Sequence, residues 1–309
     1  MNVIYDIDNW KEDAVVATIG FFDGVHPGHR FLLNEMLDIA KNKSLPSAVI
    51  TFTTHPRVVL HSDYQPKLLN SFDEKIELLS KTGVDYVIVM DFTPELAAIS
   101  AHEFITGVLA AKLHVKTLLI GYDHRFGHLR TEGFEQYSVY GSECGMEVQE
   151  ASLYSEEGMA VSSSTVRKFI MNGDVAGAST LLGYLYSLKG HVVGGHKIGR
   201  SIGFPTANIA VDEKFKVIPL EGSYAIWIII DGKRHGGMLY IGPRPTLGGD
   251  ETMSIEANIF DFSEDIYGKQ VTVEFVEFIR ENMKFGSLAE LADQMHEDKL
   301  KAQSALCLS

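Results

Sequence analysis

Two histidines stand three residues apart at the point where an apolar run gives way to a helical pattern. They are His26 and His29, within the stretch Gly20-Phe21-Phe22-Asp23-Gly24-Val25-His26-Pro27-Gly28-His29. Imidazole N–H groups can donate to phosphate oxygens, and Gly24 and Gly28 allow the backbone to pass close to a ligand. These residue types at this spacing predict a site for a phosphate chain. The alternative is two ordinary histidines at a helix start.

The hydrophobic pattern indicates which elements hold these histidines. Residues 14–20 form a short β-rich apolar run, and apolar side chains recur with helical spacing over residues 31–40. The segment therefore predicts a buried strand, a tight turn and a helix. Free amides and the dipole at the start of that helix favour an anion.

The same alternation continues through the first half of the chain. Strands are predicted at 14–20, 47–53, 85–90, 116–121 and near 147–155, and helices at 28–42, 73–82, 101–114 and 135–142. This order predicts an α/β fold with a parallel sheet. Ligands of such sheets collect at the carboxyl ends of the strands. Both histidines, the loop after Phe52 and the loop after Gly121 are therefore expected around one crevice.

The second half of the chain has a different sequence pattern. Six short β-branched strands are predicted at 187–193, 209–211, 224–230, 236–241, 255–262 and 270–278. Their lengths and the turn signals between them favour a compact antiparallel barrel. Residues 287–305 begin with a capping-box spacing and continue as an amphipathic helix. We expect two domains, residues 1–185 and residues 186–309.

Composition limits the classes of partner. The 309 residues carry a net charge of −14, which argues against a nucleic-acid or anionic-membrane surface. The two cysteines, Cys144 and Cys307, suggest neither a disulfide framework nor a metal site, and the N-terminus lacks a signal-peptide pattern. The apolar runs are far shorter than the roughly 20 residues that cross a bilayer. We expect a cytoplasmic monomer or weak homo-oligomer.

The stretch around His26 and His29 resembles the signature of the HxGH nucleotidylyltransferases, and specifically the adenylyltransferase module of the prokaryotic bifunctional riboflavin kinase/FAD synthetase family. The resemblance covers about residues 14–303. It implies a Rossmann-like domain that converts FMN to FAD and a barrel that converts riboflavin to FMN, both with ATP and Mg²⁺. Besides the histidines, it implies nucleotide contacts for Gly20, Phe22, Asp23, Gly24 and Gly28.

A serine-rich segment precedes another predicted helix. Val161-Ser162-Ser163-Ser164-Thr165-Val166-Arg167 resembles the family signature Ser-Ser-Thr-x-Ile-Arg, with Ser164 where relatives usually have Thr. Hydroxyls at a helix entrance can satisfy free amides or contact phosphate. Arg167 would supply a planar donor fork for the triphosphate or the departing pyrophosphate. A purely structural cap is the alternative for the serines.

Two further loops carry candidate ligands. Gly121-Tyr122-Asp123-His124-Arg125-Phe126-Gly127 is similar to the family loop Gly-x-Asp/Asn-Phe-x-Phe-Gly, with His124 where Phe is usual. Asp123 is a candidate for a ribose or flavin group and Arg125 or Arg130 for a phosphate, and surface charges are the alternative. His55, at the end of the strand over 47–53, matches a family motif and either contacts ligand or structures its loop.

The densest glycine cluster lies at residues 194–208. It is neither a Walker loop nor a dinucleotide-binding fingerprint, and alone it favours a mobile connection in the barrel. It resembles the riboflavin kinase flap and its Pro-Thr-Ala-Asn motif, in which Thr206 and Asn208 hold Mg²⁺ and ATP phosphates through oxygens that Mg²⁺ accepts. The resemblance also implies nucleotide contacts for Gly199, Arg200, Gly203 and Phe204.

Glu256 interrupts a mostly apolar predicted strand. Such a carboxylate lies either on the wet face of the strand or in a site. In the family, this position follows a Gly-x-Arg-Pro-Thr element, here residues 242–246, and is the proposed base for the riboflavin 5′-hydroxyl. A hydroxyl must lose a proton, and a positioned base typically contributes about 10²- to 10⁴-fold. An FMN phosphate oxygen is already a nucleophile, so the other reaction needs no base.

Arg280 is the last candidate. Residues 279–285 match the family segment Ile/Leu-Arg-x-Glu-x-Lys-Phe, with Asn282 where Glu is usual. Arg280 is expected either to face the flavin or nucleotide or to bridge to a surface carboxylate.

Two other functions compete with this assignment. One is a nucleotidylyltransferase for a different phosphorylated acceptor, with a regulatory barrel. The Pro-Thr-Ala-Asn segment and Glu256 argue against it. The other is a flavin-binding protein without catalysis, which His26, His29 and Arg167 disfavour.

Overall fold

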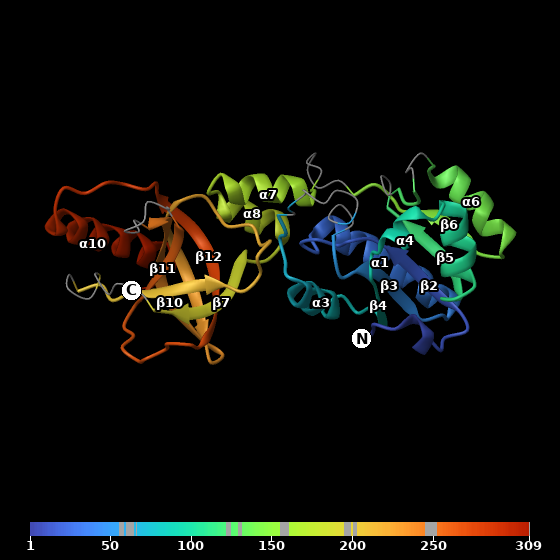
Figure 1. Cartoon of the computed structure of the whole chain (residues 1–309), viewed down its shortest axis with the longest axis horizontal. Helices are drawn as coiled ribbons and strands as arrows, with labels where there is room; N and C mark the ends of the chain where they lie inside the picture. The colour runs from blue at the N-terminus through green and yellow to red at the C-terminus, as the bar shows by residue number, and fades with distance from the viewer. Residues whose placement is uncertain are drawn as a thin grey trace. The chain divides into compact units, whose positions relative to one another are not determined.

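The structure is a computed structural model of the whole chain. It describes residues 1–55, 59, 65, 67–121, 125–128, 132–154, 161–194, 199, 203–244 and 252–308. Contacts divide the chain into two compact units, Met1–Ser162 and Ser163–Ser309 (Figure 1). No helix in these described ranges combines the length and the apolar character that a membrane span requires.

The first unit is built on a parallel sheet of six strands. They are β1 Asn2–Ile4, β2 Val15–Ile19, β3 Ser47–Phe52, β4 Tyr86–Met90, β5 Val115–Ile120 and β6 Glu147–Glu150, in the order β1-β4-β3-β2-β5-β6. Every pairing is parallel. The predicted α/β fold is confirmed. The edge strand β1 was not predicted, and β6 ends earlier than expected.

Strand order places the candidate phosphate loop at a topological switch point. From β2 the chain moves outward through β3 and β4, with the earlier strand β1 at the edge beside β4, whereas β5 and β6 lie on the other side of β2. Crevices outside the carboxyl ends of strands at such a point bind ligands in open α/β sheets. The histidine stretch follows β2 and the loop after Gly121 follows β5, so both leave the sheet there.

Helices cover both faces of this sheet. They are η1 Ile7–Asn9, α1 Pro27–Lys43, α3 Phe72–Ser80, α4 Pro94–Ala98, α5 Ala101–Glu103, η2 Phe104–Ala110 and α6 Phe134–Glu143. Alternate side chains of β2 enter two separate cores: α1 contributes Leu33 and Met36 to one, and η2 and α6 contribute Phe104 and Tyr137 to the other. The predicted helix over 101–114 is a single α-helical turn followed by the π-helix η2.

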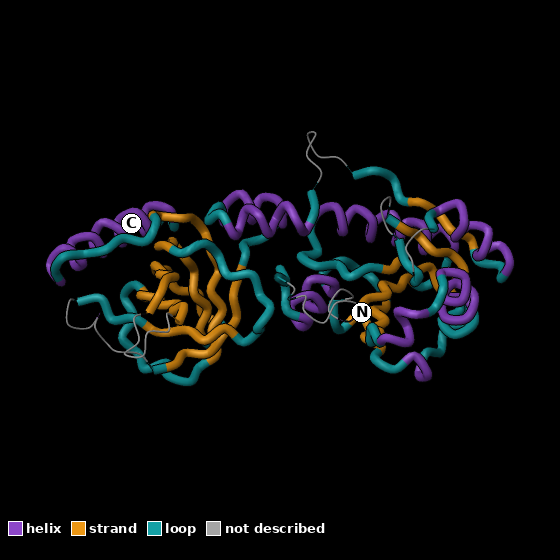
Figure 2. The backbone as a smooth tube through the Cα atoms, turned by 45° about the horizontal axis from the view of Figure 1, so that its top comes forward, coloured by secondary structure: helices purple, strands orange, loops and turns teal. Residues whose placement is uncertain are grey.

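The second unit contains a closed antiparallel barrel. Its strands are β7 Ser187–Val193, β8 Ala207–Val211, β9 Gly222–Ile230, β10 Lys233–Arg244, β11 Thr252–Ile259 and β12 Gln270–Arg280, in the order β10-β11-β8-β7-β12-β9. All six pairings are antiparallel, which confirms the predicted barrel (Figure 2).

Among the described residues, three helices belong to the second unit with the barrel. The terminal helix α10, Leu288–Ala305, was predicted; Ala302 on it and Leu306 just beyond it pack in one core cluster with Met238 and Phe260. Helices α7, Ser163–Met171, and α8, Val175–Leu182, precede β7. They fall in the second unit, where Leu220 N donates to Ile170 O at 3.3 Å. The functional boundary at residue 185 stays a prediction.

Candidate active sites

The two histidines lie at the start of helix α1, as the sequence indicated. His26 is the N-cap residue, and its Nδ1 accepts a long hydrogen bond of 3.4 Å from the backbone N of His29. The two imidazole rings stack with centroids 3.7 Å apart and planes 18° apart. Because Nδ1 accepts, a neutral His26 ring carries its proton on Nε2. Both rings lie at the positive end of the helix dipole and can therefore donate to the same anion.

The loop between β2 and α1 is strained. Phe22, Gly24 and Val25 all have positive φ, at 56°, 85° and 36°. Two of these residues are not glycine, and such conformations persist where the surrounding structure fixes them, often at functional sites. A Cβ on Gly28 would approach the His26 ring to 3.3 Å, and one on Gly20 would approach the Phe22 ring to 3.0 Å. These glycines make room for rings of the loop itself.

Asp23 binds backbone in this structure. It is 5% exposed, and its carboxylate accepts from the backbone N of Leu69 at 3.0 Å and of Asn70 at 3.3 Å. These residues lie just ahead of helix α3. Asp23 therefore ties the histidine loop to the segment that leads into α3, while its expected nucleotide contact stays a prediction.

Lys75 on helix α3 belongs to the same region and was not among the site residues predicted from the sequence. Its Nζ donates to Phe21 O at 3.2 Å, Thr51 Oγ1 at 3.2 Å and Phe52 O at 2.9 Å. Burial lowers the pKa of Lys75 from 10.5 to about 8, and the charge of Asp23 acts in the opposite direction. The signal in the sequence was a lysine three residues after Phe72 and four before Leu79, on the buried face of an amphipathic helix.

The other loops of the crevice are described in part. His55 packs its ring edge-on to Phe21 with centroids 4.7 Å apart. Arg125 is exposed after β5, whereas Asp123, His124 and Arg130 lie outside the described residues. Phe126 stacks on Tyr137 of α6, and the Tyr137 hydroxyl accepts from Phe126 N at 3.0 Å. In this structure Phe126 therefore anchors its loop to α6.

Ser162 precedes helix α7, and Ser163 and Ser164 lie in its first turn. Arg167 follows one turn later, with Nη1 3.5 Å from Ser164 Oγ. Ser162 falls in the first compact unit and the other three in the second. The phosphate contacts expected of these residues stay predictions.

The barrel brings Thr206, Asn208 and Glu256 together on neighbouring strands. Glu256 on β11 pairs in register with Asn208 on β8, and Thr206 Oγ1 donates to Glu256 Oε2 at 3.1 Å. Asn208 is 7% exposed, and its Oδ1 accepts no hydrogen bond from any described residue. A buried amide oxygen without a donor is costly, so this oxygen is suited to a ligand that the chain itself does not supply.

A hard cation fits these oxygens. The hydroxyl of Thr206, the unsatisfied Oδ1 of Asn208 and the carboxylate of Glu256 are all oxygen donors of the kind that Mg²⁺ accepts. Within the described ranges, no group of three or more His, Cys, Asp or Glu side chains is arranged to hold a metal. The expected metal site therefore depends on the oxygens of Thr206, Asn208 and Glu256.

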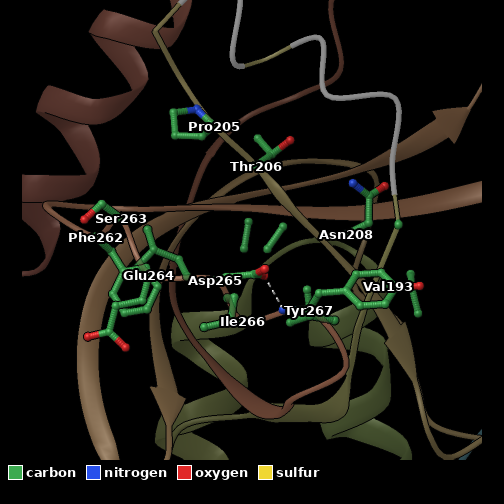
Figure 3. A pocket seen from close by; sticks show the side chains of 15 residues that line it. Val193, Pro205, Thr206, Asn208, Phe262, Ser263, Glu264, Asp265, Ile266 and Tyr267 are labelled. Atoms are coloured by element: carbon green, nitrogen blue, oxygen red, sulfur yellow. Dashed lines mark hydrogen bonds between the residues drawn. The ribbon is translucent and has the colours of Figure 1, made fainter.

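A cleft of about 720 Å³ is lined by Thr206 and Asn208 of this group. One side is formed by Pro205, Thr206 and Asn208, and the other by residues 262–267, which include Asp265 and Tyr267 (Figure 3). Apolar and aromatic surface thus lies next to a few polar groups, as in sites for small molecules. The volume is in the range of ligand pockets, roughly 300–1,000 Å³.

Backbone contacts hold the Pro-Thr-Ala-Asn segment in place. Asn258 Nδ2 donates to Pro205 O at 2.8 Å, and Phe204 N donates to Gly199 O at 2.8 Å. Phe204 is buried against the ring of His296 on α10. Gly203 has a positive φ of 83°, and Arg200 lies outside the described residues. Phe204 therefore anchors the segment from the side of α10.

Arg280 pairs with a carboxylate, which is one of the two expected roles. The partner is Asp298 on α10, only 2% exposed, so it is a buried group and not the surface carboxylate that was expected. A flavin or nucleotide contact of Arg280 stays a prediction. Nearby, Tyr240 pairs in register with Glu256 and donates its hydroxyl to Asn282 Oδ1 at 3.0 Å. Burial raises the pKa of the Tyr240 hydroxyl.

Comparisons with known proteins match two families to separate stretches of the chain. The FAD synthetase family matches residues 8–165, and the riboflavin kinase family matches residues 182–306. The chain is 36% identical over 293 residues to a bifunctional riboflavin kinase/FMN adenylyltransferase of Listeria monocytogenes, covering 94% of this chain and 92% of the relative. It is 35% identical over 301 residues to the Escherichia coli protein of that name, covering 97% and 95%.

A further relative and one solved structure extend the comparison. The Haemophilus influenzae protein with the same name is 38% identical over 282 residues, covering 91% of each chain. A crystal structure described as a macrolide-efflux protein from Streptococcus pneumoniae is 30% identical, with a TM-score of 0.87, covering 97% of this chain and 98% of that one.

Proposed function

The chain belongs to the family of bifunctional riboflavin kinase/FMN adenylyltransferases, and on that premise we propose which of its residues carry each reaction. The protein is an enzyme of FAD biosynthesis. It phosphorylates riboflavin to FMN and adenylylates FMN to FAD. Its substrates are accordingly riboflavin, FMN and ATP.

We propose that His26 and His29 bind the ATP phosphates during adenylyl transfer. An FMN phosphate oxygen attacks the α-phosphorus of ATP, the bond from that phosphorus to the bridging oxygen breaks, and pyrophosphate leaves with both electrons of that bond. No proton has to be removed, so positioning and charge stabilisation suffice. The supporting observation is the stacked imidazole pair, which begins α1 after a strained loop at the switch point of the sheet.

Arg167 and the serines of α7 are proposed to bind phosphate in the same reaction. Their support is the match to the family signature and their position at a helix start, where hydroxyls and free amides are available. The proposed contribution of Arg167 is a charge-assisted bond to the departing pyrophosphate.

Glu256 is proposed as the base of the kinase reaction. Its carboxylate takes the proton of the riboflavin 5′-hydroxyl, the hydroxyl oxygen attacks the γ-phosphorus of ATP, and ADP leaves. The supporting observation is the cluster on β8 and β11, in which Glu256 already accepts a hydrogen bond from Thr206 beside the unsatisfied Oδ1 of Asn208. The adjacent cleft is proposed to hold the nucleotide.

We propose Mg²⁺ as the metal, held by Thr206 and Asn208 together with phosphate oxygens. When bound, the ion would offset negative charge on the phosphates. The residues beside it act by position: Thr206 orients the Glu256 carboxylate, and Asn258 holds the backbone at Pro205. We also propose, from the net charge of −14, that nucleic acid is not a partner. The unpaired Cys144 and Cys307 support the proposal that the enzyme works in the reducing cytoplasm. Its proposed oligomeric state is a monomer or weak homo-oligomer.

Two variants of the full chain test this assignment. We expect Glu256→Gln to abolish FMN formation from riboflavin while FAD formation from supplied FMN continues. We expect His26→Ala to do the reverse. Both reactions are followed by chromatography of the flavins after incubation with ATP and Mg²⁺. A variant that loses both activities, or one that keeps both, would contradict the assignment of the two reactions to separate sites.

A further inference from the structure

Lys75 carries a buried charge that the two reactions, as described, do not use. The residue is 3% exposed and lies on the inward face of α3. Its ammonium faces three oxygens: Phe52 O at 2.9 Å, Phe21 O at 3.2 Å and Thr51 Oγ1 at 3.2 Å. An ammonium has three N–H donors, so these acceptors use all of them.

The three oxygens belong to two separate loops of the crevice. Phe21 lies in the loop between β2 and α1, five residues before His26. Thr51 and Phe52 end strand β3, and His55 beyond them returns to contact the Phe21 ring. One ammonium therefore connects the backbone ahead of the histidines with the end of the neighbouring strand.

The segment that leads into α3 holds the histidine loop at a second point. Asp23 accepts from the backbone N of Leu69 and Asn70, immediately ahead of α3. The loop is thus fixed on one side of Phe22 by Lys75 and on the other side by these two amides. Its positive φ values at Phe22 and Val25 require such support, because a free chain would relax them.

Packing alone does not explain a charge at this position. The Nζ lies 4.2 Å from the centroid of the Phe21 ring and 5.2 Å from that of Phe72. An apolar side chain of similar length would fill the space between these rings without the desolvation cost of an ammonium. Besides its cation–π contacts with these two rings, what the ammonium provides is the simultaneous hold on three oxygens.

We propose that the Lys75 ammonium is a positioning group for adenylyl transfer: it fixes the loop at Phe21 against the end of β3 and thereby sets where His26 and His29 meet the phosphates. This inference depends on the proposed function of the histidine pair. Lys75 acts through the loop backbone and touches no substrate.

Deprotonation would weaken this hold. A neutral amine keeps only two N–H donors, so one of the three bonds is lost. Burial lowers the pKa of Lys75 to about 8. The other titratable groups around this point are Asp23, Glu74 and His55, and reference values for carboxyl and imidazole groups lie well below 8. We therefore expect FAD formation to fall above pH 8, with a midpoint that kinase activity does not share.

The test measures FAD formation from FMN and ATP between pH 7 and 9.5 in the full chain. The variants are Lys75→Met, Lys75→Arg and the control Lys81→Met, which removes an exposed lysine paired with Glu77 on the same helix. We expect Lys75→Met to lose about 10- to 100-fold in kcat/KM at pH 7. We expect Lys75→Arg to keep most activity without a midpoint near 8, because arginine stays charged.

Kinase activity of the same samples is the internal control, and it should be unchanged in all three variants. Wild-type rate and pH profile in Lys75→Met would overturn the proposal. So would a midpoint near 8 that persists in Lys75→Arg. If Lys75→Met does not fold, the comparison of the wild type with Lys75→Arg still decides between these outcomes.

Folding of the first unit can be followed separately. The chain has two tryptophans, Trp10 in the first unit and Trp227 in the second. Emission of Trp10 in a Trp227→Phe background therefore reports the first unit alone. His26→Ala tests the histidine site separately from Lys75. Unchanged FAD formation in His26→Ala overturns the histidine site itself. If FAD formation is lost in His26→Ala but unchanged in Lys75→Met, only the role of Lys75 is overturned.

Discussion

Arg280 on β12 forms an ion pair with Asp298 on α10. Its Nε donates to Asp298 Oδ2 at 2.9 Å, and its Nη2 lies 2.9 Å from the same oxygen. Ser223 Oγ lies 3.3 Å from the same oxygen, and Gln294 donates to Oδ1 at 3.0 Å. The terminal helix is thus joined to the barrel by a buried ion pair as well as by apolar packing.

Asp298→Ala should therefore destabilise the barrel by about 3–5 kcal/mol, because removing one partner leaves the other charge uncompensated. Urea unfolding followed by Trp227 emission, in a Trp10→Phe background, measures the change. Asp293→Ala, at an exposed position on the same helix, is the control and should change the free energy of unfolding by less than about 0.5 kcal/mol. Equal stability of both variants would show that the pair contributes nothing.

Asn208→Leu should separate stability from function. The substitution removes a buried oxygen without a donor, so the ligand-free barrel should be at least as stable, by up to about 1 kcal/mol. Kinase activity should be lost, because the metal then lacks an oxygen. Mg²⁺ with ADP should raise the melting temperature of the wild-type barrel and leave that of the variant unchanged. An equal rise in both proteins would exclude Asn208 from the metal site.

Tyr137→Phe should loosen the loop after β5. The fully buried hydroxyl accepts from Phe126 N, and its loss leaves that amide without this acceptor at a cost of about 1–3 kcal/mol. The matched control is Tyr140→Phe on the same helix, where the hydroxyl bonds the Glu132 carboxylate and is half-buried. Trp10 emission during urea unfolding measures both. A larger effect at Tyr140 would contradict this interpretation of the loop.

Local patterns in the sequence predicted most of the fold and the centre of each site. The histidine spacing, the barrel strands and Glu256 are all visible within short windows, because helical and strand periods are local. The strand β1 was missed because three residues, only partly buried, show no period. The π-helix η2 was missed because its apolar spacing resembles that of an α-helix.

Contacts between residues distant in the chain could not be predicted in the same way. Asp298 and Arg280 are separated by 18 positions, and either side chain alone looks like a surface charge. Lys75 finds its acceptors 23 to 54 positions away. Its place on the buried face of α3 was a usable signal, but the identity of its partners depends on strand order, which periodicity does not specify.

The burial of Lys75 also predicts how stability depends on pH. Above pH 8 the free energy of unfolding should rise with pH, whereas FAD formation should fall. The pKa of Lys75 is about 8 in the folded chain and 10.5 in the reference state, so between these values the unfolded chain binds one more proton. The free energy of unfolding then rises with pH, by about 1.4 kcal/mol per unit and about 3 kcal/mol across the window. Below pH 8 both states are protonated, and this dependence disappears.

Because other lysines and tyrosines titrate in the same range, the measured quantity is the difference between the wild type and Lys75→Met. Urea unfolding of the first unit, followed by Trp10 emission, would be compared at pH 7.5, 8.5 and 9.5. The wild type should gain stability relative to the variant over this range while its FAD formation falls. A difference that stays constant with pH would show that Lys75 keeps its proton, and the alkaline loss of activity would then need another cause.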